Sequence, residues 1–484
     1  MKAACVMVLG TSSGAGKSWL ATALCRWYAR QGLEVAPFKA QNMSNNARVV
    51  ATPEGGEGEI GSAQYSQALA ARVPPDVRMN PVLLKPESDT RSQVVVRGRV
   101  DAALAAVAWR ERSAHLWPVA RDALDELRVE NDVVVIEGAG SPAEINLRES
   151  DFVNLQVARH AQARCLLVTD IDRGGAFAHL YGTWALLGPE ERALLRGFVL
   201  NRFRGDPGLL APGPEQLQRL TGVPTVATLP MVWQHGLPEE DGVFHDVARA
   251  GGEVRLTIAV VAYPRISNLD EFQPLANIPG VALRWVRTPA QLRGADWVIL
   301  AGSKNTPADL QWLRAQGLDR AIADFAQAGG QVLGVCGGLQ MLGEALVDPD
   351  DLAGNAPGLG LLPLVTRFER TKTVHRTRVA FEPLLPPWSA LSRLALDAYE
   401  IHHGVTMQHA GMAHGRRALQ DGLGWQNEKG NVLGVYVHGL FEDPGVLRAL
   451  FGATVPTLDS VFDRLADVAD EHFATGVLPS LISC

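Results

Sequence analysis

Short apolar runs and longer amphipathic stretches alternate along most of the chain. The runs are rich in Val, Ile and Leu and end where glycine or polar residues begin. The stretches between them are long enough for helices that cross from one strand to the next. Parallel strands covered by helices on both faces have this pattern. The sequence therefore predicts an α/β protein with doubly wound, mostly parallel sheets.

The apolar runs form two series, which predict two domains. The first series of strands is expected at residues 5–10, 35–39, 132–138, 165–170 and 197–203. The second is expected at residues 256–264, 281–286, 296–302, 331–338 and 431–439. Glycine-rich residues 51–59 are expected to form a mobile loop. The expected divisions are a first domain at 1–240, a linker at 241–253, a second domain at 254–446 and a C-terminal helical extension at 447–484.

The charge, hydrophobicity and cysteine content of the chain indicate what kind of molecule it binds and in which compartment it works. The 484 residues carry 45 basic and 52 acidic side chains, a net charge of −7, with no Lys- or Arg-rich run. Small-molecule substrates are therefore expected, and nucleic acid is not. No window offers about 18 consecutive apolar residues, so no membrane partner is expected. The five cysteines lack the spacing of a metal site or a disulfide framework, which favours the cytoplasm. The sequence is silent on the oligomeric state, and a homo-oligomer stays open.

The segment GTSSGAGKS at residues 10–18 has the composition of a phosphate-binding loop. Its glycines allow backbone N–H groups to surround phosphate oxygens, Lys17 supplies positive charge, and Ser18 can ligate Mg²⁺. The alternative is an ordinary glycine-rich turn between a strand and a helix. The spacing resembles the loop of the dethiobiotin synthetase group, so the first domain is expected to be P-loop NTPase-like. The residues predicted to bind ATP are Gly10, Thr11, Gly14, Gly16, Lys17, Ser18 and Lys39.

Polar residues also follow other predicted strands of the first half. Glu137 ends the run DVVVIE, and we expect it to hold Mg²⁺ together with Ser18. The alternative is an ordinary acid at a strand end. Weaker candidates for binding substrate or ion are Gln41, Asn42, Asp170, Asp172 and Arg173. For Gln41, Asn42 and Arg173 the alternative is an ordinary hydrophilic loop.

A cysteine in the second half stands at a sharp turn between a predicted strand and a helix. Small residues flank Cys336 in GVCGG, which leaves the thiol exposed, and the helix N-terminus favours the thiolate. His438 ends a later apolar strand and can serve as general base. The alternatives are a buried core cysteine and a structural histidine. Backbone donors of an oxyanion hole are expected at Gly302, Ser303 and Gly337.

These segments resemble the flavodoxin-like class I glutamine amidotransferase domain. In that family a cysteine attacks the side-chain amide of glutamine and releases ammonia. A Glu normally stands two residues after the His, where this chain has Leu440. The resemblance therefore implies that no carboxylate orients His438 and that glutamine is hydrolysed slowly.

Longer stretches resemble the cobyric acid synthase family of the cobalamin pathway, in the family's order along nearly the whole chain. They include PFKAQNMSNN (37–46), MNPVLLKPESD (79–89), IEGAGSPAEINL (136–147), TDIDRGGAFAHLYG (169–182), YPRISNLDEF (263–272) and AGSKNTPADL (301–310). The resemblance implies a glutamine-hydrolysing, ATP-dependent amide ligase that requires Mg²⁺. Its corrinoid substrate would be adenosylcobyrinic acid a,c-diamide, amidated on the b, d, e and g carboxylates to adenosylcobyric acid.

Two other functions fit parts of the same pattern. A cobyrinic acid a,c-diamide synthase shares both domain types, although PFKAQNMSNN and MNPVLLKP favour cobyric acid synthase. A non-enzymatic P-loop regulatory ATPase could carry a degenerate glutaminase domain, although intact Cys336 and His438 count against it. The number of amides added to a corrinoid distinguishes these functions.

Overall fold

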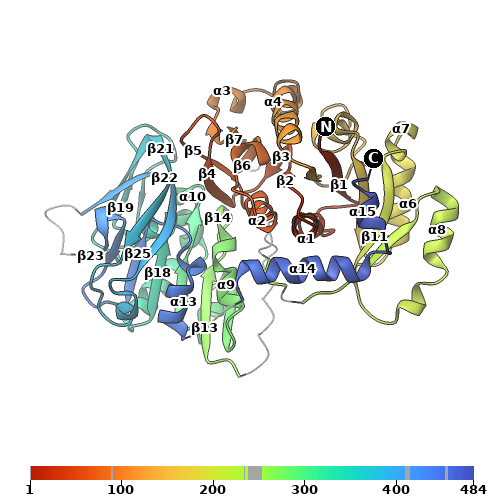
Figure 1. Cartoon of the computed structure of the whole chain (residues 1–484). Coiled ribbons are helices and arrows are strands. Elements are labelled where there is room, and N and C mark those ends of the chain that lie inside the picture. Colours follow the sequence, from red (N-terminus) through yellow and green to blue (C-terminus); the bar gives the residue numbers. More distant parts are fainter. Residues whose placement is uncertain are drawn as a thin grey trace.

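The protein has two α/β halves, each built on its own sheet (Figure 1). The computed structural model describes residues 2–88, 91–233, 235–237, 253–408, 415–452 and 456–483. Apart from residue 253, the linker expected at 241–253 lies outside the described residues. The predicted α/β class with two mostly parallel sheets is confirmed.

The N-terminal half contains six parallel strands, because long buried runs of Val, Ile and Leu suit strands that are covered on both faces. In spatial order they are β12 (Thr225–Pro230), β11 (Leu195–Phe203), β10 (Arg164–Asp170), β1 (Ala4–Gly10), β9 (Val133–Glu137) and β2 (Val35–Phe38). Five of them coincide with the predicted strands, and β12 was not predicted. The helices of this half are α1 (Lys17–Arg30), α2 (Ser62–Ala70), α3 (Ala102–Ala105), α4 (Trp109–Glu130), α5 (Val157–Ala161), α6 (Ala176–Leu186), α7 (Pro189–Arg192) and α8 (Gly213–Thr221).

The C-terminal half contains a seven-stranded sheet. In spatial order its strands are β15 (Val281–Val286), β13 (Leu256–Val261), β16 (Trp297–Leu300), β18 (Gln331–Val335), β25 (Val432–Val435), β24 (Gly424–Gln426) and β23 (Arg416–Leu419). The first five are parallel and include all the strands predicted for this half, whereas β24 and β23 are antiparallel additions. The helices of this half are α9 (Gln273–Ala276), α10 (Thr306–Ala315), α11 (Leu318–Gln327) and α12 (Gly337–Leu342).

Smaller sheets complete the two halves. They comprise β3 (Gln41–Met43), β6 (Val82–Ser88), β7 (Arg91–Val96) and β8 (Arg99–Val100); the hairpin of β4 (Ala47–Ala51) and β5 (Glu57–Gly61); the pair β14 (Ile266–Ser267) and β17 (Gly302–Ser303); and β19 (Ala345–Val347), β20 (Ala356–Pro357), β21 (Val365–Ala380) and β22 (Ala395–Met407). The hairpin packs against β21 and β22 of the other half (Figure 1). The loop predicted at 51–59 is therefore shorter than expected: residue 51 and residues 57–59 belong to the paired strands, and residues 52–56 form the turn between them. Gly55 and Gly56 adopt φ values of 82° and 116°, which let the chain turn tightly between paired strands.

Three helices follow the last strand. Helix α13 (Pro444–Phe451) packs in the core of the C-terminal half, whereas α14 (Leu458–His472) and α15 (Val477–Ser480) return to the N-terminal half. In Figure 1, α14 lies beside α1, and the two helices are in contact. Trp27 donates its indole N–H to Asp470 over 2.7 Å, and the Tyr28 hydroxyl donates to the Leu478 carbonyl over 2.9 Å. The extension at 447–484 therefore packs partly on the synthetase-like half.

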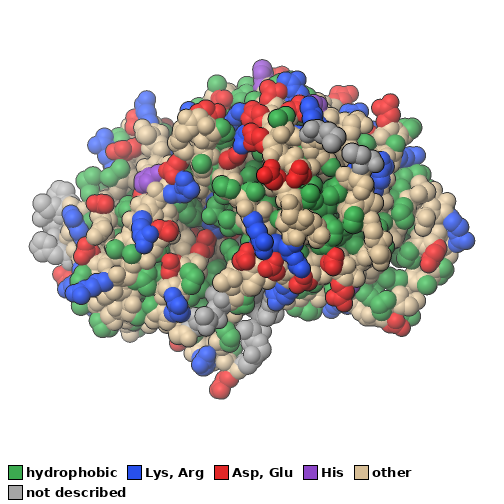
Figure 2. All heavy atoms as spheres, viewed as in Figure 1, with side chains coloured by type: hydrophobic (Ala, Val, Ile, Leu, Met, Phe, Trp, Pro, Cys, Tyr) green, Lys and Arg blue, Asp and Glu red, His purple; other side chains and the backbone are tan. Residues whose placement is uncertain are grey.

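The surface is of mixed charge. On the face shown in Figure 2, acidic and basic side chains of the described residues are interspersed. Among the described residues, every helix is too short or too polar to pass through a lipid bilayer.

Candidate active sites

The P-loop residues form one compact turn between β1 and α1. Lys17 folds back over this turn, and its Nζ donates to the carbonyls of Ser12 and Gly140, each over 3.0 Å. A Cβ on Gly10 would lie 2.9 Å from that Nζ, so glycine is needed for the lysine to approach. Gly16, with φ of 100°, takes a conformation that favours glycine. The hydroxyl of Thr11 lies 3.0 Å from that of Thr169 on β10.

Asn201 is a residue near this loop that the sequence analysis missed. It stands on β11, and its Nδ2 donates to the Ala15 carbonyl over 3.0 Å. A Cβ on Gly16 would lie 1.9 Å from this Nδ2. Asn201 thus holds the P-loop against β11. Its position inside a predicted apolar strand hid this contact.

Glu137 is buried beside the P-loop and accepts three hydrogen bonds. Its Oε1 accepts from the Ser18 hydroxyl and from Lys39 Nζ, each over 2.9 Å. Its Oε2 accepts from Gln67 Nε2 on α2 over 2.6 Å. Burial raises the pKa of this carboxyl, but the charge of Lys39 and the hydrogen bonds from Lys39, Gln67 and Ser18 lower it more. Glu137 is therefore held as a carboxylate, and Gln67 is a partner that the sequence analysis did not identify.

The Ser18 and Glu137 pair has the chemistry of a Mg²⁺ site. Both supply oxygen, and they touch each other beside the loop that would carry phosphate. Mg²⁺ in nucleotide sites usually takes one or two protein oxygens and completes its shell with phosphates and water. Among the described residues, no group of three or more His, Cys, Asp and Glu side chains is arranged for a metal. The residues present thus fit a nucleotide-bound Mg²⁺ better than a protein-caged one.

The weaker candidates lie at the same edge of the sheet but differ in their contacts. Asp170 is buried and pairs with Arg202 Nη1 at 3.0 Å and with Arg173 Nε at 3.3 Å. Asp172 pairs with Arg204. Arg173 also approaches the P-loop, since a Cβ on Gly14 would lie 3.6 Å from its Nη2. Arg173 is therefore placed to meet a phosphate, whereas Asp170 and Asp172 hold arginines.

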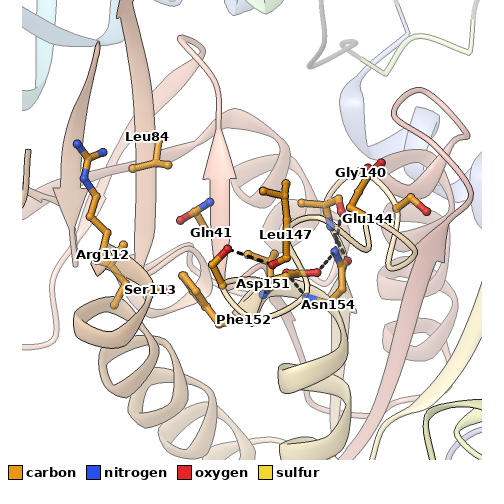
Figure 3. A pocket seen from close by; sticks show the side chains of 15 residues that line it. Gln41, Leu84, Arg112, Ser113, Gly140, Glu144, Leu147, Asp151, Phe152 and Asn154 are labelled. Atoms are coloured by element: carbon orange, nitrogen blue, oxygen red, sulfur yellow. Dashed lines mark hydrogen bonds between the residues drawn. The ribbon is translucent and has the colours of Figure 1, made fainter. Parts of the chain in front are cut away.

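A cavity of about 210 Å³ adjoins the P-loop (Figure 3). Gln41 of β3 lines it, and the buried Asn42 turns away to donate to Gln64 over 3.3 Å. The walls of the cavity combine apolar and polar groups, among them Gln41, Leu84, Arg112, Gly140, Glu144 and Leu147. Because Lys17 is bonded to Gly140, the cavity opens beside the residue expected to contact phosphate.

Cys336 stands at the turn between β18 and α12, and its side chain is buried, so the expectation of an exposed thiol is wrong. Its backbone has φ of 51° and ψ of −106°, an unfavourable conformation for a non-glycine residue that sharp nucleophile turns adopt. A Cβ on Gly337 would lie 2.7 Å from the Ser303 backbone nitrogen. The structure thus places Ser303 against Gly337, the residue after Cys336, and a Cβ on Gly302 would lie 3.2 Å from His438 Cε1. The Sγ of Cys336 lies 3.6 Å from the Ile401 carbonyl.

His438 has a carboxylate partner, so the expectation that no carboxylate orients it is wrong. Its Nδ1 lies 3.0 Å from Oε1 of Glu271, and Glu271 Oε2 accepts the Gly439 N–H over 3.1 Å. Both side chains are buried. Glu271 lies in the helical turn Leu269–Phe272, directly before α9. It supplies the orienting carboxylate that Leu440 cannot provide. The expected slow hydrolysis of glutamine loses its physical basis.

The electrostatics of this pair favour a charged imidazole. Burial alone lowers the pKa of His438, but the negative charges of Glu271 and Cys336 and hydrogen bonds to both raise it to about 10. Cys336, His438 and Glu271 therefore form a triad in which the imidazole interacts with both the sulfur and the carboxylate.

Comparison with known proteins yields matches along the whole chain. The model of the "CobQ/CobB/MinD/ParA nucleotide binding domain" matches residues 6–240, and that of the "CobB/CobQ-like glutamine amidotransferase domain" matches residues 257–446. Cobyric acid synthase of Variovorax paradoxus (strain S110) is 70% identical over 484 residues, covering 100% of both chains. That of Paracidovorax citrulli (strain AAC00-1) is 69% identical over 480 residues, covering 98% of both. The resemblance indicated by the motifs is confirmed.

Proposed function

Because the chain belongs to the cobyric acid synthase family, we propose that it converts adenosylcobyrinic acid a,c-diamide to adenosylcobyric acid by amidating the b, d, e and g carboxylates. It is a glutamine-hydrolysing, ATP-dependent amide ligase of cobalamin biosynthesis. The observation that carries the proposal is the presence of two built sites in one chain: a P-loop with a buried carboxylate, and a Cys336–His438–Glu271 triad. We place the reaction in the cytoplasm.

Ammonia release is assigned to the triad. The Cys336 thiolate attacks the side-chain amide carbon of glutamine, and the N–H groups around Gly302, Ser303 and Gly337 stabilise the oxyanion. His438 then gives its proton to the departing nitrogen, which leaves as ammonia. Water activated by His438 hydrolyses the resulting thioester to glutamate. Glu271 keeps the imidazole in the orientation needed for both proton transfers.

Activation of the carboxylate is assigned to the P-loop half. A corrinoid carboxylate oxygen attacks the γ-phosphorus of ATP, forming an acyl phosphate and releasing ADP. Lys17 and the P-loop N–H groups stabilise the charge on the transferring phosphoryl group, and Arg173 lies beside them. Mg²⁺, held by Ser18 and Glu137 when bound, would neutralise phosphate charge. Ammonia attacks the acyl carbon and expels phosphate, leaving the amide.

The cavity beside Gly140 is proposed to receive one carboxylate-bearing arm of the substrate. At about 210 Å³ it is small for a ligand site and cannot enclose a corrin macrocycle. Leu84 and Leu147 can pack on the methylene groups of such an arm, and Gln41 can donate to its carboxylate. The macrocycle would stay outside, so different arms could enter the same cavity in successive reactions.

Product mass tests the function. The purified protein is incubated with glutamine, ATP, Mg²⁺ and adenosylcobyrinic acid a,c-diamide, and the corrinoids are followed over time by mass spectrometry. We expect successive species ending at four added amides. Two amides added to cobyrinic acid, with none added to the diamide, would instead identify an a,c-diamide synthase. A corrinoid that stays unchanged while ATP is hydrolysed would point to a regulatory ATPase.

A further inference from the structure

A buried arginine from the synthetase half reaches the glutamine-hydrolysing site. Arg48 lies on β4, and its guanidinium donates to Asp270, Glu442 and the Tyr399 hydroxyl, all of the other half. The side chain of Arg48 is 7% exposed and that of Asp270 is 2% exposed. The contact therefore lies inside the protein, where charge-assisted hydrogen bonds hold their geometry well.

Each partner of Arg48 either contacts Glu271 or His438 or lies close to one of them in the chain. Asp270 directly precedes Glu271, whose carboxylate contacts His438. The Tyr399 ring stacks on the His438 imidazole, with centroids 5.3 Å apart and planes inclined by 21°. Tyr399 also accepts the His438 backbone N–H over 2.9 Å. Glu442 ends the short helical turn Leu440–Glu442 that follows His438.

The backbone around Arg48 interlocks with the segment that carries Glu271. Asn268 Nδ2 donates to the Ala47 carbonyl over 2.8 Å and to the Tyr399 hydroxyl over 2.9 Å. The Leu269 N–H donates to Asn46 Oδ1 over 3.0 Å. The turn bearing Glu271 therefore rests on β4, and its position depends on how the two halves dock.

The guanidinium of Arg48 neutralises negative charge around His438. Three carboxylates lie around this site: those of Asp270 and Glu271 are buried, and that of Glu442 is 28% exposed. Burial raises the pKa of Asp270 and of Glu442, and the charge of Arg48 opposes that rise. Without Arg48, these side chains would have to protonate or repack, and Glu271 and Tyr399 would lose their support.

We propose that Arg48 is a positioning residue of the glutamine-hydrolysing site, contributed by the synthetase half, which holds Glu271 and Tyr399 against His438. The glutaminase site is then complete only when the two halves are docked. This inference rests on the proposed function, because it assigns glutamine hydrolysis to the triad.

The test compares Arg48→Ala with Arg48→Lys and a matched control in the full-length protein. Glutamate release gives kcat and KM for glutamine, and corrinoid amidation driven by ammonium chloride reports on the other site. For Arg48→Ala we expect kcat of glutamine hydrolysis to fall about 100-fold, the loss typical of a misplaced catalytic group. KM for glutamine and ammonium-driven amidation should change less than about 3-fold, because neither needs His438 to be oriented. Arg48→Lys should recover part of kcat, since an ammonium keeps the charge but cannot bond all three partners.

The control is Glu57→Gln on the same hairpin. Glu57 Oε1 lies 2.9 Å from Arg376 Nε across the two halves, outside the group around His438. This variant should keep both activities. Equal losses of glutamine-driven and ammonium-driven amidation in Arg48→Ala would show a general structural role and overturn the inference, as would an unchanged kcat. If Arg48→Ala does not fold, Arg48→Lys is used instead. Its kcat of glutamine hydrolysis and its rate of ammonium-driven amidation, each relative to the wild type, are then compared in the same way. Failure of the wild type to amidate a corrinoid with ammonium would instead refute the proposed function, while glutamate release still tests Arg48.

Discussion

Glu271 and His438 form a buried ion pair whose energy depends on pH. His438 has a pKa raised to about 10, because attraction to Glu271 and Cys336 outweighs the burial that lowers it. A histidine in the unfolded chain has a pKa of about 6.5. Since the folded value is the higher one, the stability contributed by the imidazolium is complete below about pH 6.5 and is lost as the pH rises toward 10.

Glu271→Gln tests this pair by stability and by rate. The variant should be less stable than the wild type at pH 6, and the difference should shrink as the pH approaches 10, measured as midpoints of denaturant unfolding. Its kcat for glutamine hydrolysis should fall by about 10²- to 10⁴-fold, the range seen when the acid that orients a catalytic histidine is neutralised. A stability difference independent of pH, with an unchanged kcat, would contradict the triad.

Cys336 and Lys17 test the separation of the two chemistries. Cys336→Ala should lose glutamine-driven amidation and keep the ammonium-driven reaction, because ammonia can reach the acyl phosphate without the thiol. Lys17→Ala should lose both by about 10²- to 10³-fold, since it removes charge stabilisation at the transferring phosphoryl group. Measuring corrinoid amidation with glutamine and with ammonium in each variant checks this. Loss of the ammonium-driven reaction in Cys336→Ala would refute the division of labour.

Local sequence identified some catalytic residues and missed others for a geometric reason. Cys336 was recognisable because its strained turn requires small neighbours. Glu271 was not, because it is 167 positions from His438 in the chain and no local spacing links the two. Gln67 and Asn201 were missed for the same reason, since their partners come from other elements of the fold. A role that depends on tertiary contact leaves no periodic signal.

Among the elements, the buried parallel strands were the easiest to predict. Their apolar runs are nearly continuous, as in β9 and β1, because both faces are covered. The short strands between the halves were not predicted. β3 contains Gln41, Asn42 and Met43, and such a polar segment becomes a strand through pairing with β6. Likewise, residues 57–59 of β5 were predicted as loop, because the adjoining glycine-rich turn dominates the local composition.

The packing of α14 on α1 can be tested by removing one buried side chain. Leu465 is fully buried in the core shared by these helices. Leu465→Ala should lower the free energy of unfolding by about 2–5 kcal/mol, from lost apolar contact and the cavity left behind. Denaturant unfolding of the variant and the wild type measures this difference in the free energy of unfolding. Asp467→Ala, which removes an exposed pair with Arg30 from the same helix, should cost less than about 1 kcal/mol. Similar effects of the two changes would contradict a structural role for α14.

At the scale of the whole molecule, a buried group of charges also joins the two halves. Glu59 on β5 pairs with Lys85 of its own half at 2.6 Å and with Lys372 of the other half. Lys304, which follows Gly302 and Ser303 in the chain, donates to Gln93 over 2.8 Å, and Lys372 donates to the same oxygen over 3.2 Å. Like Arg48, this group makes the docking of the halves depend on complementary charge.

Glu59 is the acid that neutralises this lysine group. Burial raises its pKa, but Lys372 and Lys85 hold it well below its usual range. Burial lowers the pKa of Lys372 to about 8, although Glu59 opposes the change. Glu59→Gln would leave two buried lysines without this carboxylate, so the free energy of unfolding at pH 7 should fall by about 3–5 kcal/mol.

The double variant Glu59→Gln/Lys372→Met separates the ion pair from other effects of the substitution. Because it removes both charges, its loss of stability should be smaller than the sum of the two single losses, as measured by denaturant unfolding of all four proteins. The loss in Glu59→Gln alone should also shrink as the pH rises toward 8, because Lys372 without Glu59 has a pKa below 8 and releases its proton in the folded variant. Additive losses that do not vary with pH would show that the halves dock without help from this pair, leaving Arg48 and the interlocked turn at Asn268 as the contacts that align the two sites.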